Sequence, residues 1–490
     1  MIEDGQSVIS DATVALAWSQ TAVYPDLADA PFHPHEAYPE YRYKTVSANP
    51  NPAYALVREC LMMMGLDRDR AGTAAWNPLG DLIRPGDKVV LKPNWVLHLN
   101  QAGLGMACMT THPSILRAML DYTLLARPGS VTVGDAPLQL CDFESLLNYG
   151  YRDVIAFHAH RDAPVRTRDF RRTILVEDPR DHALSENLRP MDEFVLVDVG
   201  RDSLLEDITG TGTPFRVTMY DPRKMKDNHA PGRHRYLVAR EILDADVVIN
   251  LPKLKMHKKA GITCALKNLI GINGNKDYLP HHRKGPTALG GDNYPESSPL
   301  KWTAEQVLEV AYRNMGRKHL YHTLHFIAEK LLILNMKLGG NGDVEGGWYG
   351  NDTIWRTCLD LNRILLHSDP EGTLHEHPQR RVLSLADAIV IGDGDGPLKP
   401  GPYPMGCILG AANPAALDWV AAILMGLDPE QVPICRHAIE NRAYPILTDR
   451  NIRCTTREGI LDLPALAERF TFSPEPPPGW KGHCEWETDP

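Results

Sequence analysis

The chain has 490 residues, of which 43% are hydrophobic, and 62 acidic residues outnumber 52 basic ones, so its net charge is −10. This length predicts two to three domains, or one large α/β domain with insertions. An acidic chain argues against nonspecific binding to nucleic acid. The longest unbroken apolar run, 419–425, is far shorter than the roughly 20 residues that a membrane span needs. We therefore expect neither nucleic acid nor membrane as a partner.

The nine cysteines are dispersed along the chain, and no two are spaced C-x-x-C. Such a set is typical of reduced thiols, so we expect neither a disulfide framework nor an iron–sulfur cluster. The first ten residues are acidic and lack the basic and then apolar pattern of a secretory leader. We expect a cytoplasmic protein.

Strand-like and helix-like runs alternate in the first third of the chain. The pattern predicts strands at 13–17, 88–91 and 130–133, and helices at 52–66 and 113–126. This order favours a parallel sheet with right-handed crossovers. In such sheets, polar residues just beyond the carboxyl ends of the strands collect in one crevice.

Five polar residues are predicted to lie at that crevice. Lys92, Asn94 and Asp135 follow predicted strands, and Thr111 and His112 open the second predicted helix. Amides and hydroxyls at the start of a helix favour an anion. A plain capping role is the alternative for His112.

The remaining elements suggest a second α/β segment after an insertion. We expect strands at 246–250 and 388–391, and helices at 303–312, 317–338, 351–366 and 415–425. The fold class is therefore α/β, with a mostly parallel sheet flanked by helices and one or two large insertions. We divide the chain into an N-terminal α/β segment at 1–160, an inserted β-rich segment at 161–240, a C-terminal α/β segment completing the core at 241–470, and a flexible tail at 471–490.

A dense basic block is at odds with the acidic balance of the chain. Between positions 253 and 284 there is one acid, Asp277, against eight cations: Lys253, Lys255, Lys258, Lys259, Lys267, Lys276, Arg283 and Lys284. The usual reason for such a block is a bound anion such as phosphate, carboxylate, sulfate or an acidic sugar. The alternative is a solvated basic face, against which the interspersed Gly, Asn and Pro argue.

Lysines at predicted strand ends are the candidate reactive groups. A lysine with a buried stem holds an anion or, when desolvated, acts as a base. We predict catalytic roles for Lys92, Lys253, Lys255, His257 and His282. We predict substrate contacts from Asn94, Thr111, His112, Lys267, Asn268, Lys276 and Arg283.

A glycine-rich turn, Gly392-Asp393-Gly394-Asp395-Gly396, places two carboxylates two residues apart. Carboxylate oxygens are ligands of hard divalent cations, and histidine binds transition metals. We therefore expect a divalent metal ion, of unknown identity, held by Asp135, Asp393, Asp395 and His281. A tight, solvated turn without metal is the alternative.

Several segments together resemble the domain of unknown function 362 family, over 88–427 and in the same order. They are V-V-L-K-P-N-W at 89–95, T-T-H-P at 110–113, V-T-V-G-D-A at 131–136, D-A-D-V-V-I-N-L-P-K-L-K-M-H at 244–257, A-L-K-N-L-I-G at 265–271, G-D-G-D-G-P-L at 392–398 and N-P-A-A-L-D at 413–418. Many members of that family carry a ferredoxin-like segment with clustered cysteines, a pattern from which this chain departs.

We expect a metal-assisted enzyme acting on a small anionic substrate (a carboxylate, phosphate or acidic sugar) in a biosynthetic pathway. Cations and carboxylates both fall at predicted strand-end loops, which supports this hypothesis. One alternative is an oxidoreductase with a non-covalent or partner-borne redox cofactor. Another is a non-catalytic anion-binding or metal-binding protein. Whether the chain forms homo-oligomers stays open.

Overall fold

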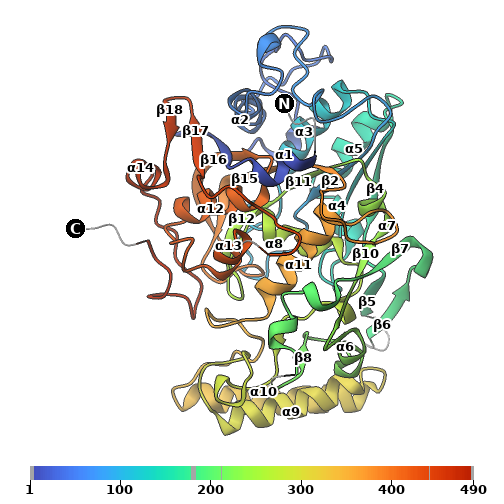
Figure 1. The fold of residues 1–490 in the computed structure, drawn as a ribbon, viewed down its shortest axis with the longest axis vertical. Coiled ribbons are helices and arrows are strands. Elements are labelled where there is room, and N and C mark those ends of the chain that lie inside the picture. The colour runs from blue at the N-terminus through green and yellow to red at the C-terminus, as the bar shows by residue number, and fades with distance from the viewer. Residues whose placement is uncertain (1–4, 178–183, 211, 441, 487–490) are drawn as a thin grey trace.

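The structure, a computed structural model, describes residues 5–177, 184–210, 212–440 and 442–486. An eleven-stranded mixed and mostly parallel sheet forms its centre, with helices on both faces (Figure 1). The strand order is β18–β17–β1–β16–β15–β11–β2–β3–β4, with β12 paired to β15 and β13 to β12. The strands are β1 (Thr13–Trp18), β2 (Lys88–Pro93), β3 (Ser130–Asp135), β4 (Val165–Asp169), β11 (Val247–Leu251), β12 (Lys253–His257), β13 (Gly261–Thr263), β15 (Arg381–Asp393), β16 (Gly401–Ala411), β17 (Arg453–Thr456) and β18 (Gly459–Leu461).

The parallel centre of the sheet confirms the predicted α/β class. β2 pairs in parallel with β3 and β11, and β11 pairs in parallel with β15. Asn250 of β11 lies opposite Lys92 of β2 on one side and Ser384 of β15 on the other. The carboxyl ends of β2, β3 and β11 therefore reach the same edge, where polar side chains can gather.

Helices cover both faces of the sheet and bury two hydrophobic cores. They are α1 (Gly5–Ser10), α2 (Pro52–Met63), α3 (Pro113–Leu125), α4 (Phe143–Leu147), α5 (Tyr151–Ala159), α6 (Pro222–Asn228), α7 (Arg240–Leu243), α8 (Ala265–Asn268), α9 (Pro299–Arg313), α10 (Lys318–Lys337), α11 (Ile354–His367), α12 (Pro414–Leu424), α13 (Pro433–Ala438) and α14 (Leu463–Arg469). The core of one face contains residues of α2 to α5, and that of the other face contains residues of α7, α8 and α11 to α14.

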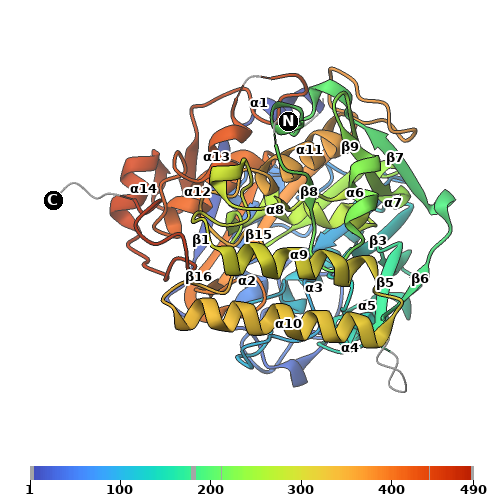
Figure 2. The same cartoon turned by 90° about the horizontal axis from the view of Figure 1, so that it is seen from below.

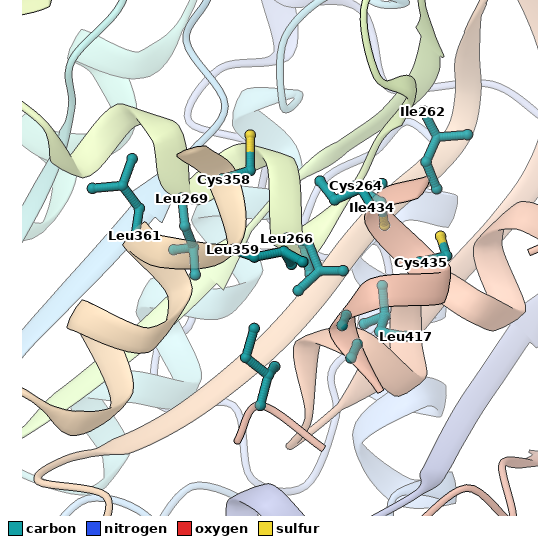
Figure 3. Close-up of a cluster of buried hydrophobic side chains, with 14 of the residues drawn as sticks. Ile262, Cys264, Leu266, Leu269, Cys358, Leu359, Leu361, Leu417, Ile434 and Cys435 are labelled. Carbon is teal, nitrogen blue, oxygen red and sulfur yellow. The ribbon is translucent and has the colours of Figure 1, made fainter. Parts of the chain in front are cut away.

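The second core surrounds the short helix α8. Leu266 of α8 lies among Leu359 of α11, Leu417 of α12 and Ile434 of α13 (Figure 3). All four side chains are fully buried. Because side chains alternate along a strand, Val90 packs into this same core and Lys92, two residues later, points to the α8 side.

Smaller sheets lie beside the main one. β7 (Phe194–Asp198), β10 (Arg233–Ala239) and β9 (His229–Ala230) form a three-stranded sheet. Two further pairs are β8 (Phe215–Arg216) with β14 (His282–Arg283), and β5 (Thr173–Glu177) with β6 (Leu184–Leu188). Most of these strands fall in the 161–240 segment that the sequence suggested is rich in β-structure.

The helix predicted at 303–312 begins earlier than expected. Ser298 caps α9 by accepting the backbone N–H of Lys301, and Pro299 occupies the first turn. Thr303, where the predicted helix began, lies inside α9. α9 and α10 form a helical hairpin along one end of the molecule (Figures 1 and 2).

Chain ends meet in the main sheet. β1 lies between β16 and β17, so the N-terminal strand is flanked by C-terminal ones. Trp480, within the segment expected to be a flexible tail, is buried, and its indole N–H donates to the Lys258 carbonyl at 2.7 Å. Within the described ranges, no helix has the length and apolar character to span a bilayer.

Candidate functional site

A cavity of about 470 Å³ lies where β2, β3 and β12 end. Its cationic and imidazole side chains are Lys255, His257, Lys258, Lys259, Lys267, Lys276, His281 and Lys399. Apolar side chains, among them Leu97, Leu138 and Ile270, line other parts of the wall. The cavity therefore combines a basic part with an apolar part.

A buried ion pair borders the cavity. The Lys92 ammonium lies 2.8 Å from Asp135 Oδ1, and both side chains are at most 4% exposed. Asp135 also accepts the backbone N–H of Trp95 at 2.7 Å and of Ala136 at 2.9 Å. Because its oxygens already have these partners, Asp135 serves as the counter-ion of Lys92 in this structure.

A chain of amides holds Lys255 in place. The Lys255 ammonium donates to Asn94 Oδ1 at 2.5 Å and to the Met109 carbonyl at 2.5 Å. Asn94 donates to Asn268 Oδ1, and Asn268 donates to Asn250 Oδ1. These acceptors are neutral, so burial holds the pKa of Lys255 well below its ordinary value, with neighbouring cations adding to the effect.

Three further lysines of the cavity have no counter-ion. In the described part of the chain, the ammonium groups of Lys259, Lys267 and Lys276 have neither a hydrogen-bond acceptor nor a carboxylate within ion-pair distance. Burial lowers the pKa of Lys259 and of Lys267. It lowers the pKa of Lys276 to about 7, with repulsion from Lys267 as the next cause. Among the described residues, these three ammonium groups thus have no direct partner, although the carboxylates of Asp135, Glu345 and Asp395 also line the cavity.

Local structure fixes the position of Lys267. The carboxylate of Asp418 on α12 accepts the backbone N–H groups of Ala265 at 2.6 Å and Leu266 at 3.1 Å, which caps the first turn of α8. Burial raises the pKa of Asp418 to about 7. α8 therefore presents Lys267 and Asn268 to the cavity from a fixed support.

The two histidines have opposite hydrogen-bonding character. His257 Nδ1 lies 3.1 Å and 3.2 Å from the backbone nitrogens of Lys259 and Ala260, so it accepts and the neutral ring carries its proton on Nε2. His281 Nδ1 lies 2.7 Å from the Leu279 carbonyl, so it donates and Nε2 is left as an acceptor. Burial holds the pKa of both rings well below the ordinary value. At the other ring nitrogen, Nε2, His257 is therefore a donor and His281 an acceptor.

A known protein family matches the part of the chain that contributes most residues of this cavity. Residues 208–423 match the family model described as domain of unknown function (DUF362). The chain carries a DUF362 domain. Lys255, Lys259, Lys267, Lys276 and both histidines of the cavity lie within it.

Two further matches are more distant. A thylakoid-associated protein of Synechocystis sp. is 28% identical over 193 residues, which is 39% of this chain and 41% of that protein. The chain thus matches about two fifths of the length of that curated relative. A crystal structure of a Thermotoga maritima protein aligns at 13% identity over 72% of this chain and 55% of that chain, with a TM-score of 0.29, which is too low to carry an argument.

The DUF362 match confirms the family resemblance for its second half. The motifs at 244–257, 265–271, 392–398 and 413–418 lie inside the matched residues, and those at 89–95, 110–113 and 131–136 precede them. The segment before the domain nevertheless contributes Asn94 and Asp135 to the cavity wall.

Three predicted residues lie in a separate buried network. The Lys253 ammonium lies 3.2 Å from Asp387 and donates to the Tyr24 hydroxyl at 2.6 Å. His112 caps α3 and stacks on Tyr24 with ring centroids 4.0 Å apart. Thr111 donates to the carbonyl at the end of β11 at 2.6 Å. The structure gives these side chains partners that connect segments of the fold, away from the cavity lining.

His282 and Arg283 also lie apart from the basic cavity. His282 lines a second cavity of about 680 Å³ beneath α9 and α10, where its Nδ1 has no hydrogen-bond partner among the described residues. Arg283 lies 3.5 Å from Asp292 and 3.7 Å from Asp352. The adjacent His281 and His282 thus face different cavities, as expected for neighbours in an extended segment.

Three of the four predicted metal ligands, Asp135, His281 and Asp395, line the basic cavity, but Asp393 does not. Asp393 accepts the backbone N–H of Glu475 at 2.5 Å, and Asp395 lies at the rim shared by the two cavities. In the residues that the structure describes, no group of three or more His, Cys, Asp or Glu side chains is placed to hold a metal ion. A Cβ on Gly396 would lie 1.9 Å from the Met256 carbonyl, so close packing on β12 explains a glycine in this turn.

Sequence reasoning missed several residues of the wall, among them Lys258, Lys259, Lys399, Gln139 and Thr263. Lys259 belongs to the basic block but received no role, although it lines the cavity. Gln139 and Thr263 are buried residues of the cavity, and in the part of the chain that the structure describes Gln139 Oε1 and Thr263 Oγ1 have no hydrogen-bond partner. The charge of the block was a usable signal for Lys259, whereas Gln139 and Thr263 lie in segments without a distinctive pattern.

Proposed function

We propose that the protein is an enzyme acting on a small anionic substrate, a carboxylate, phosphate or acidic sugar, bound in the basic cavity. The observation that carries this proposal is that Lys259 and Lys267 are buried, and Lys276 half-buried, in one cavity without a counter-ion among the described residues. An uncompensated buried charge is unfavourable, so negative charge placed next to this wall would stabilise the protein. A bound anion would supply that charge.

The same wall offers groups that transfer protons. Lys276, with its pKa of about 7, is suited to gain and lose a proton near neutral pH. Neutral His281 presents Nε2 as a proton acceptor, and neutral His257 presents Nε2–H as a donor. In this proposal, Lys255 and Lys267 hold the anionic group, and Lys276 or His281 moves a proton on the bound substrate.

The divalent metal expected from the sequence stays a prediction. Asp395 and Glu345 at the rim of the cavity are carboxylates that an ion bound to the substrate could approach. Carboxylate oxygen is a suitable ligand for Mg²⁺ or Mn²⁺. Such an ion would neutralise substrate charge and orient it.

Thermal melting of the purified protein tests the proposal. Inorganic phosphate, a diphosphate, citrate and a sugar acid are added separately to the native protein, to Lys267→Met, and to Lys44→Met, an exposed control outside the site. A ligand at about 100 times its Kd stabilises by about 2.7 kcal/mol. We expect at least one anion to raise the melting temperature of the native and control proteins and to have little effect on Lys267→Met.

The ligand identified in this way is then tested for turnover. Conversion by the native protein that is lost in Lys276→Met supports the enzymatic role. Stabilisation without conversion would make the protein an anion carrier, and equal stabilisation of native protein and Lys267→Met would refute the site. The oxidoreductase alternative is checked by the absorption spectrum of the same sample.

A further inference from the structure

The α9–α10 hairpin carries a concentration of exposed apolar side chains. Of 19 large apolar side chains exposed in the described part of the chain, eight lie in this hairpin and its last cap: Trp302, Val310, Leu320, Phe326, Ile327, Leu334, Met336 and Leu338. These 40 residues, 299–338, are less than a tenth of the chain. Scattered exposed leucines need no explanation, but a gathering of this kind indicates an interaction surface.

The outer surface of α10 is apolar and basic together. Tyr321, Ala328 and Asn335 face the protein, and they mark one side of the helix at seven-residue intervals. Phe326 is 56% exposed and Leu334 45% exposed on the other sides. Lys330 and Lys337 lie on the same outer surface. The 20 residues of α10 make the helix about 30 Å long at 1.5 Å per residue.

Charge on the hairpin opposes the net charge of the chain. Its exposed cations are Arg313, Arg317, Lys330 and Lys337. Its exposed acid is Glu329, because the other two acids, Glu305 and Glu309, are buried residues of α9. In a chain of net charge −10, this face is locally cationic. A cationic face attracts a surface that carries negative charge.

The shape of the hairpin favours an extended, flat partner. α9 and α10 lie side by side across the end of the molecule seen in Figure 2, so their outer sides form one broad surface. A helix with Trp, Phe and Leu beside Lys and Arg is suited to the boundary between lipid headgroups and acyl chains. Long lysine side chains reach the headgroups while their stems cover apolar surface.

We propose that the outer face of the α9–α10 hairpin docks onto an anionic lipid bilayer. The hairpin lies in the plane of the interface, with Phe326, Ile327 and Leu334 in contact with the acyl boundary. Lys330 and Lys337 contact the negatively charged headgroups. A second copy of this chain fits less well, because two such faces would bring their cations together. This peripheral contact departs from the expectation that no membrane partner exists.

Co-sedimentation of the full-length protein with vesicles tests the proposal. The vesicles are equal parts phosphatidylglycerol and phosphatidylcholine, or phosphatidylcholine alone. The variants are Lys330→Gln with Lys337→Gln, and Phe326→Gln with Ile327→Gln, since Gln keeps a high helix propensity. Ile460→Gln, at a side chain 64% exposed on β18, is the matched control for an apolar substitution.

We expect binding to the mixed vesicles that decreases at high salt, and much weaker binding to phosphatidylcholine alone. The double lysine variant should bind roughly 30-fold more weakly, at about 1 kcal/mol per basic residue near an anionic surface. The double apolar variant should bind at least about ten-fold more weakly, since Phe and Ile each contribute more than 1 kcal/mol when buried. Ile460→Gln should bind as the native protein does.

Three results would overturn the proposal. They are no binding to the mixed vesicles, equal binding to both kinds of vesicle, and equal losses in the Ile460→Gln control. Analytical ultracentrifugation without lipid adds a fourth arm. A dimer that dissociates in Phe326→Gln with Ile327→Gln would assign this face to self-association instead.

Discussion

Replacing either of two buried lysines, Lys92 or Lys267, with methionine should change the stability of the protein in opposite directions. Lys92 and Lys267 are both buried, but Lys92 has Asp135 at 2.8 Å, whereas Lys267 has no counter-ion in the described part of the chain. Methionine has a similar shape and no charge. Lys267→Met removes an uncompensated cation, and Lys92→Met leaves Asp135 as an uncompensated anion.

The expected magnitudes follow from these environments. Replacing a buried ion pair with apolar side chains stabilises by up to about 4 kcal/mol, which we take as the upper limit for removing an unpaired cation, and breaking a buried pair destabilises by about 3–5 kcal/mol. At about 2.1 cal/mol/K per residue, cooperative unfolding of 490 residues has an entropy near 1 kcal/mol/K. Lys267→Met should therefore raise the melting temperature by up to about 4 °C, and Lys92→Met should lower it by about 3–5 °C.

The dependence on pH supplies an independent check. Burial lowers the folded-state pKa of Lys267 below that of the unfolded chain, so the unfolded state binds more protons between the two values. The native protein therefore gains stability as pH rises through that interval. The advantage of Lys267→Met should be fully present below the folded-state pKa and should disappear as pH rises to the ordinary lysine value.

The assay is urea unfolding followed by tryptophan fluorescence, without added anions, at several pH values. Lys44→Met, at an exposed side chain, should change the free energy of unfolding by less than about 0.5 kcal/mol. The reasoning is refuted if Lys267→Met destabilises the protein as strongly as Lys92→Met does, because Lys267 would then contribute favourable contacts in the empty cavity.

Three further predictions concern the cavity and its rim. Stabilisation by a bound anion should weaken as pH rises above about 7, where unliganded Lys276 loses its charge, and calorimetry in two buffers should show proton uptake on binding. Gly271→Ala should destabilise by about 3 kcal/mol or more in urea unfolding, because its Cβ would lie 2.0 Å from Asp135 Oδ1 and displace the carboxylate from its pair. If the expected metal binds at the cavity rim, elemental analysis should find a near-stoichiometric ion that is lost in Asp395→Ala with Glu345→Ala; an unchanged metal content in that variant would refute those ligands.

Local pattern was sufficient for the central strands and insufficient for β15. β2, β3 and β11 are short aliphatic runs, so their positions are visible in the sequence, although β2 and β3 each extend two residues beyond the predicted end, to Pro93 and Asp135. β15 extends over Arg381–Asp393, although only 388–391 was predicted. Its first half contains Asp387 and Ser384, which are buried polar residues with partners on distant segments. Such partners depend on tertiary structure and leave no local pattern.

The positive charge of the site was predictable from the sequence, but which of its lysines have a carboxylate partner was not. Lys92, Lys253 and Lys255 all follow aliphatic runs and look equivalent in the sequence. Only the fold shows that the first two have carboxylates, Asp135 and Asp387, and that Lys255 has neutral acceptors. Those carboxylates come from other strands, so sequence separation hides the pairing.

The pairing also indicates how much negative charge a ligand should bring. Lys255, Lys259, Lys267 and Lys276 line one cavity, and like charges held close together raise each other's energy in a medium of low dielectric constant. A ligand with one negative charge would leave most of that repulsion in place. A ligand with two or three charges, such as a phosphate, a diphosphate or a tricarboxylate, would offset it and allow the lysines to stay protonated. Affinity should therefore increase steeply with ligand charge, and a monocarboxylate of the same size should bind much more weakly than citrate.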